Sequence, residues 1–161
     1  MRTITRALVT GCMALFVMLW ALPLNAKVLN MTGTWKLNVE KSDGGGQPLP
    51  KGVVMVKIVH KEPALKFSET GTDAEGHPFN VEFDGAIDGK PYNVTAPQVI
   101  ETDTFKRIKD STVGGTTTSA DGKTTSTYTV TVSKDGKVMT LKITGKGPEG
   151  EFKHSVVYEK Q

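Results

Sequence analysis

Apolar and polar residues alternate along most of the chain after residue 32, and this alternation constrains the fold more than any other feature. The clearest run places Phe79, Val81 and Phe83 on one face, opposite Asn80 and Glu82. A period of two residues is typical of a strand with one face buried and one face in water. No segment keeps a helical period over ten or more residues. The chain is therefore expected to be all-β.

Short turns separate the alternating segments. The expected strands lie near residues 33–39, 53–60, 65–68, 79–83, 92–94, 104–108, 112–119, 124–133, 138–144 and 152–158. Asp-Gly pairs begin at residues 88, 121 and 135, and this dipeptide favours tight β-hairpins. Three glycines and two prolines within residues 42–50 predict a loop there. These signals predict an antiparallel up-and-down meander of about 8–10 strands, an arrangement that can close into a β-barrel.

The first 26 residues have the pattern of a secretory signal peptide. Arg2 and Arg6 make the start basic, an apolar run covers residues 7–24, and Ala26 supplies a small residue at the expected cleavage point. An uncleaved membrane anchor is the alternative, because about 20 apolar residues can span a bilayer. We expect cleavage, with export to the periplasm or the extracellular space and no stable membrane span afterwards.

Residues 27–161 are expected to form a single barrel domain, a common domain size. The only cysteine, Cys12, lies in the leader, where residues 9–12 resemble a lipobox. Most of the apolar run follows Cys12 instead of preceding it, so we expect Cys12 to be removed with the leader. The exported domain would then have no disulfide and would depend on its core for stability.

The charge of the expected domain is close to balanced. The chain has 20 Lys and Arg against 17 Asp and Glu, and without Arg2 and Arg6 the net charge is only +1. The lysines are spread along the chain without a basic block. Nucleic-acid binding is therefore not expected, since it requires a basic face or stripe.

The first expected strand carries a motif that resembles a known superfamily. The run from Gly33 to Leu37 reads Gly-Thr-Trp-Lys-Leu and contains Trp35, the only tryptophan after the leader. It is similar to the opening of the calycins, which include lipocalins and fatty-acid-binding proteins; lipocalins carry Gly-x-Trp on the first strand. The whole chain also resembles small exported bacterial proteins of lipocalin-like type. The resemblance implies a barrel with Trp35 at its floor and a small hydrophobic ligand inside.

The last expected strand departs from both calycin families. Fatty-acid-binding proteins close with Arg-x-Tyr, which holds the ligand carboxylate, whereas Val156 precedes Tyr158 here. Lipocalins place an arginine over the tryptophan near the last strand, and this strand contains no arginine. The resemblance therefore implies the barrel without the arginine that binds a fatty acid.

The alternation and the resemblance together suggest which side chains would meet a ligand. The candidates are Trp35, Val56, Ile58, Phe79, Phe83, Phe105, Arg107, Tyr128, His154 and Tyr158. Arg107 could stack on Trp35 or hold an anionic group, or it could be a surface residue. Tyr128 and Tyr158 could offer hydroxyl groups to a ligand or be core aromatics.

Metal and catalytic patterns are weak in this sequence. His60, His77 and His154 do not have metal-ligand spacing, and no Ser/His/Asp order or carboxylate pair stands out. We expect no metal, no cofactor and no catalysis. Some calycin barrels hold haem through a histidine near the chain end, so His154 leaves a haem-binding enzyme as a third hypothesis.

Two functional hypotheses lead at this point. The first is binding of a small apolar or amphipathic molecule inside the barrel, suggested by the apolar faces near residues 54–58 and 79–83. The second is a ligand-free structural or interaction domain of the cell envelope. Interior volume distinguishes them, because bulky side chains that fill the barrel would leave no room for a ligand.

Overall fold

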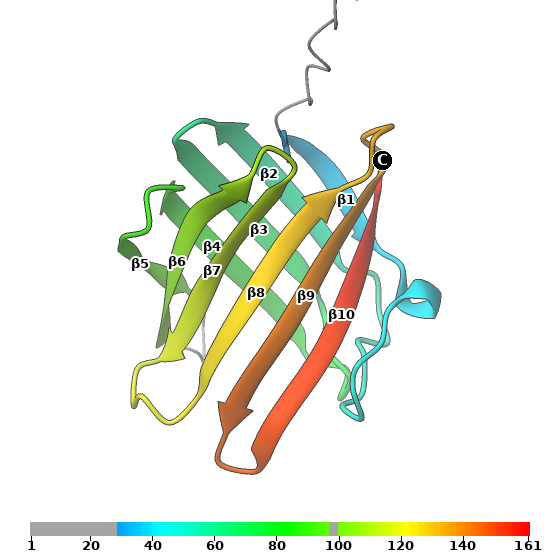
Figure 1. The fold of residues 1–161 in the computed structure, drawn as a ribbon. Coiled ribbons are helices and arrows are strands. Elements are labelled where there is room, and N and C mark those ends of the chain that lie inside the picture. The colour runs from blue at the N-terminus through cyan, green and yellow to red at the C-terminus, as the bar shows by residue number, and fades with distance from the viewer. Residues whose placement is uncertain (1–28, 97–99) are drawn as a thin grey trace, which may run out of the picture.

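A computed structural model describes residues 29–96 and 100–161 as a closed barrel of ten strands (Figure 1). The strands are β1 (Gly33–Leu37), β2 (Met55–Lys61), β3 (Ala64–Thr72), β4 (Pro78–Ala86), β5 (Pro91–Thr95), β6 (Ile100–Lys109), β7 (Thr112–Ser119), β8 (Thr125–Val132), β9 (Val138–Gly147) and β10 (Gly150–Lys160). A single 3-10 turn, η1 (Val39–Lys41), follows β1. The predicted signal peptide and Cys12 lie outside the described residues.

Each strand pairs antiparallel with the next along the chain, and β1 closes the barrel by pairing with both β2 and β10. This arrangement confirms the predicted all-β meander and its closure into a barrel. Closure leaves no sheet edge unpaired. Among the described residues, no helix is both long and apolar enough to cross a membrane.

The predicted Asp-Gly turns are present at all three positions. Gly89, Gly122 and Gly136 have positive φ values of 79°, 69° and 74°, a conformation that glycine adopts at little cost. In each turn the preceding aspartate accepts a hydrogen bond from the backbone N–H two residues later. Local turn chemistry therefore fixes three of the hairpins that bring the strands into register.

The second strand confirms the predicted alternation and settles the role of its two faces. Val56 and Ile58 are buried in the barrel, whereas Val59 on the other face is 64% exposed. This strand therefore lines an apolar interior and is not covered on both sides. Val54, just before β2, is also buried, but Val53 is 60% exposed.

Trp35 is fully buried, and it ties β1 to the segment that precedes it. Its indole N–H donates a 2.8 Å hydrogen bond to the carbonyl oxygen of Met31, so the polar edge of the ring is satisfied. The Lys160 ammonium lies 5.2 Å from the ring centroid and donates to the Thr32 carbonyl oxygen. A lysine of β10 thus takes the position over the tryptophan for which the sequence offered no arginine.

The predicted loop at residues 42–50 is confirmed, but one part of it is held against the barrel. Asp43 and Ser155 exchange two backbone hydrogen bonds of 2.8 Å and form an isolated bridge to β10. The Ser42 hydroxyl also accepts from the backbone N–H of Val157 at 2.9 Å. The β1–β2 connection is therefore anchored on β10 near its beginning.

Candidate functional site

The barrel interior holds a partly open cavity of about 270 Å³. Every strand except β1 contributes to its wall, together with the segment before β1. The lining residues are Met31, Val56, Ile58, Leu65, Phe67, Glu69, Val81, Val94, Glu101, Asp103, Phe105, Thr117, Ser126, Tyr128, Val130, Met139, Leu141, Ile143 and Tyr158. The volume lies just below the range of about 300–1,000 Å³ typical of sites for drug-sized ligands. The barrel therefore has room for a small organic molecule.

The aromatic rings of Phe67, Phe105 and Tyr128 line part of the cavity, and Phe67 and Phe105 pack against Phe83, which does not line it. Phe67 stacks on Phe83 with centroids 5.2 Å apart, and Phe105 meets Phe83 edge-on at 4.8 Å. Tyr128 packs edge-on against Phe105 at 5.3 Å. Edge-on and offset contacts of this kind stabilise a fixed arrangement of rings. This wall offers a ligand a rigid apolar surface.

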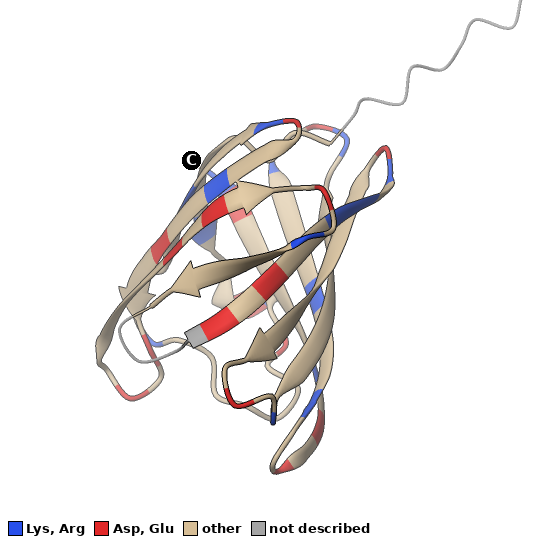
Figure 2. Cartoon of the chain, turned by 90° about the vertical axis from the view of Figure 1, so that its left-hand side faces the viewer, with Lys and Arg blue, Asp and Glu red and all other residues tan. Residues whose placement is uncertain are grey.

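Three carboxylates interrupt the apolar lining: Glu69 on β3, and Glu101 and Asp103 on β6. Glu69 accepts a 3.0 Å hydrogen bond from the Tyr158 hydroxyl, and Asp103 accepts one of 2.5 Å from the Thr117 hydroxyl. Figure 2 shows acidic positions in red on the strands of the barrel wall as well as in the turns. The cavity is thus apolar in most of its lining and acidic at one end.

Removal from water changes how these acids titrate. Burial raises the pKa of Glu69, and the hydrogen bond from Tyr158 opposes this in part. Burial also raises the pKa of Asp103 and of Glu101, and the charge of Asp103 raises the pKa of Glu101 further. Each negative charge is costly where it stands, because the interior solvates it less well than water does.

The sequence reasoning missed these three acids, although the signal was present. Glu69 shares the inward face of β3 with Leu65 and Phe67, and Asp103 shares that of β6 with Phe105. Acidic residues in a β-rich chain usually lie in turns or on the outer face, which argues against an inward position. Glu69 and Asp103 are nevertheless two residues from Phe67 and Phe105, and side chains at this spacing share one face of a strand. The structure places both acids inside the barrel, as this two-residue spacing predicts.

The predicted ligand-facing residues divide into two groups. Five of them line the cavity: Val56, Ile58, Phe105, Tyr128 and Tyr158. The other five do not line it: Trp35, Phe79, Phe83, Arg107 and His154. Trp35 and Phe83 are buried as part of the packed core.

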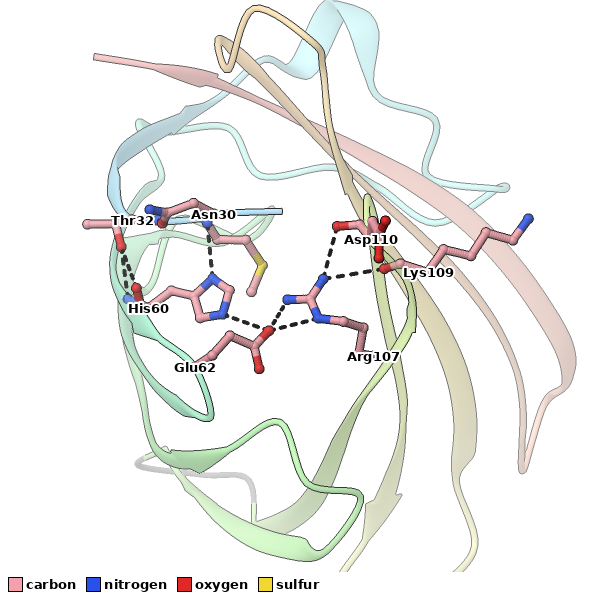
Figure 3. A network of polar contacts seen from close by, with 8 residues as sticks. Asn30, Thr32, His60, Glu62, Arg107, Lys109 and Asp110 are labelled. Carbon is pink, nitrogen blue, oxygen red and sulfur yellow. Dashed lines mark hydrogen bonds and ion pairs between the residues drawn. The ribbon is translucent and has the colours of Figure 1, made fainter. Parts of the chain in front are cut away.

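Arg107 lies on the inner face of β6, but it belongs to a network at the other end of the barrel (Figure 3). Its guanidinium donates to Glu62 through Nε at 2.8 Å and through Nη2, and to the Asp110 carbonyl oxygen at 3.0 Å. Figure 3 shows the side chain pointing across the barrel toward Glu62 and His60. Arg107 therefore neither stacks on Trp35 nor faces the cavity.

His60 is the buried member of the same network. The exposure of its side chain is 2%; Nδ1 accepts from the Met31 backbone N–H at 3.3 Å, and Nε2 makes no hydrogen bond, lying 3.5 Å from a Glu62 oxygen. Burial lowers the pKa of His60, and the charge of Arg107 lowers it further. The imidazole is thus held neutral, with its proton on Nε2, and the hydrogen bond at Nδ1 joins the N-terminal segment to β2.

His154 is half-buried, with its ring stacked on Phe152 at 5.7 Å between centroids. Burial lowers the pKa of His154, and the charge of Asp43 opposes this shift. His154 is outside the cavity lining, so the cavity offers no imidazole to a haem iron. Within residues 29–96 and 100–161, no group of three or more His, Cys, Asp or Glu could hold a metal ion.

We expect replacement of Glu69 by Gln to stabilise the barrel at neutral pH. Because burial raises the folded-state pKa, the wild-type free energy of unfolding should fall as the pH rises from about 4.5 through that pKa. Glu69→Gln keeps an acceptor for Tyr158 and removes the charge. Urea unfolding from pH 4 to 8 should show a flatter profile and a gain of roughly 0.5–2 kcal/mol at pH 8.

Glu82 provides the matched control for this measurement, because it lies on the exposed outer face of β4. Glu82→Gln should leave the wild-type pH profile unchanged. An equal flattening in both variants would show that burial of Glu69 is not the cause.

The fold is shared with solved structures of other proteins. No protein-family model matches the chain, and no curated protein matches it. Among solved structures, Rv2717c from M. tuberculosis is similar, with 14% identity and a TM-score of 0.51 over 81% of this chain and 92% of that one. Two redesigned β-barrels are more distant. The barrel b11L5F_LGL has 12% identity and a TM-score of 0.45 over 81% of this chain and 91% of that one. The barrel mFAP1, bound to DFHBI, has 13% identity and a TM-score of 0.41 over 81% of this chain and 94% of that one. The likeness to Rv2717c shows a shared antiparallel β-barrel fold.

Proposed function

We propose that this chain is an exported binding protein that holds a small apolar or amphipathic molecule inside its barrel, without catalysis. The observation that carries the proposal is the cavity of about 270 Å³, whose wall is mainly apolar. A barrel with a purely structural role gains from filling such a space, because each unfilled cavity costs stability. An interior that is left open and lined with costly carboxylates is better explained by a ligand.

The proposal includes a place in the calycin superfamily and a location outside the cytoplasm. The Gly-x-Trp motif of β1, the up-and-down barrel and the lysine over Trp35 support the first part. The basic and apolar pattern of residues 1–26 supports the second.

Filling the cavity should weaken binding strongly. The neutral dye N-phenyl-1-naphthylamine should bind the wild-type protein saturably, with a rise in fluorescence as it leaves water. Val130 lines the cavity, so Val130→Phe should reduce the affinity by about tenfold or more, since it removes the space that the dye occupies. Leu141→Trp is a second cavity-filling variant, in case the first does not fold.

Val59→Phe is the matched control for surface binding of the dye, because Val59 is 64% exposed on the outer face of β2. It should bind the dye as the wild type does. Dye binding that survives in both folded cavity variants would contradict the interior site, and no saturable binding to the wild type would contradict a site for apolar molecules.

A further inference from the structure

The charge of the cavity narrows the class of ligand. Among the described residues that line it, three are acidic and none is Lys, Arg or His. The inner face does carry the cations Arg107 and Lys160, but both are engaged elsewhere, with Glu62 and with Thr32 and Trp35. The carboxylates of the cavity therefore have no positive side chain to neutralise them.

The acids gather at one end of the cavity. Glu69 is near the end of β3, and Asp103 is near the start of β6, so antiparallel pairing puts both toward the end of the barrel that carries the β3–β4 and β7–β8 turns. Thr117 pairs with Asp103, and Ser126 pairs with Thr117, which continues the polar level onto two more strands. Arg107 lies four residues beyond Asp103, about 13 Å along the strand. The acidic end of the cavity is thus distinct from the Arg107 network.

The carboxylates retain unused hydrogen-bond capacity. Asp103 is 7% exposed; its Oδ1 accepts from Thr117, while Oδ2 has no hydrogen-bond partner among the described residues. Glu101 makes no side-chain hydrogen bond within the same part of the chain, although it lines the cavity. These acceptors are therefore available to a donor on a molecule in the cavity.

The raised pKa values of Glu69, Glu101 and Asp103 fit the same arrangement, because burial disfavours the charged form of each. A bound cation would offset the cost of burying these carboxylates. A bound carboxylate would instead add a fourth negative charge to the same space.

From this arrangement we infer that the cavity takes an amphipathic amine, with its ammonium group at Glu69, Glu101 and Asp103 and its apolar part against the Phe67 and Phe105 wall. The inference rests on the proposed function, since it names the ligand class of that same site. A protonated amine supplies up to three N–H donors and a positive charge, which the carboxylates lack. An amine has the opposite charge to the ligand of the fatty-acid-binding proteins, whose carboxylate is held by an arginine.

Three probes with the same alkyl chain test the inference: octylamine, 1-octanol and octanoate, each titrated at pH 7 into the full chain by NMR. Octylamine should bind about 10- to 100-fold more tightly than octanol, and octanoate more weakly than octanol. Octanol binding without a preference for octylamine would overturn the inference and leave the proposed function standing. Absence of binding by all three would count against both.

Substitutions of the three acids test whether they cause the preference for octylamine over octanol. The triple variant Glu69→Gln, Glu101→Gln and Asp103→Asn should bring the affinity for octylamine within about threefold of the affinity of the same variant for octanol. If the triple variant does not fold, Glu101→Gln alone should weaken octylamine severalfold. Glu82→Gln, on the outer face, should change neither probe. Full retention of the octylamine preference in the folded triple variant would also overturn the inference.

Discussion

Replacing Trp35 with Ala should lower the free energy of unfolding by about 3–5 kcal/mol, the largest effect expected of any single substitution here. Trp35 is fully buried, so its loss removes a large apolar surface and leaves a cavity in the core of the barrel. The Met31 carbonyl oxygen would also lose its hydrogen bond from the indole. Urea unfolding followed by far-UV circular dichroism measures the change without relying on tryptophan fluorescence.

Two further variants check the cause of this loss. Trp35→Phe should cost less than Trp35→Ala, because it keeps part of the ring volume and loses the bond to Met31. Val59→Ala, on the exposed face of β2, should change stability by no more than about 0.5 kcal/mol. A loss below about 1 kcal/mol for Trp35→Ala would contradict the role of this residue as a main packing element of the barrel core.

Replacing Gly115 with Ala should cost about 3 kcal/mol or more. A Cβ atom at this position would lie 1.7 Å from the Thr104 carbonyl oxygen and 2.6 Å from the Tyr128 hydroxyl oxygen. The missing side chain lets the Tyr128 phenol pass over β7 and donate a 2.6 Å hydrogen bond to Thr104 on β6. Relief of the overlap would require β6 and β7 to move apart, which would also disturb the cavity wall.

Gly147→Ala is the matched control, because its nearest new contact would be an ordinary 3.4 Å from the Thr124 hydroxyl oxygen. Thermal unfolding of the two variants should show a clearly lower midpoint for Gly115→Ala and a midpoint near wild type for Gly147→Ala. Equal midpoints would show that the close approach of Tyr128 does not depend on glycine at residue 115.

Most of the fold could be predicted from local patterns. The alternation around Phe79 to Phe83 and the Asp-Gly turns each act within a few residues, and together they specified the strands and hairpins. Barrel closure is a long-range property, and it was inferred from the strand count and the Gly33–Trp35 motif. The pairing of β1 with β10 confirms that inference.

The site was harder to predict, because it depends on which residues meet across the barrel. Arg107 is two residues from Phe105, the spacing of an inward-facing residue. Its partner Glu62 is 45 positions away in the sequence, so the sequence alone does not show that the two side chains meet. Lys160 reaches Trp35 only because β10 closes onto β1. The two-residue spacing from buried aromatics is enough to place Glu69 and Asp103 inside the barrel. That both line one cavity could be seen only from the strand pairing.

The central claim is that a small molecule occupies the barrel interior, and native mass spectrometry of the full chain, purified from the cells that produce it, tests it most directly. The account predicts a one-to-one complex with a small organic molecule in the wild-type protein. The complex should persist in Val59→Phe and disappear in Val130→Phe. A wild-type mass with no bound molecule, together with no saturable binding of N-phenyl-1-naphthylamine or octylamine, would contradict the account.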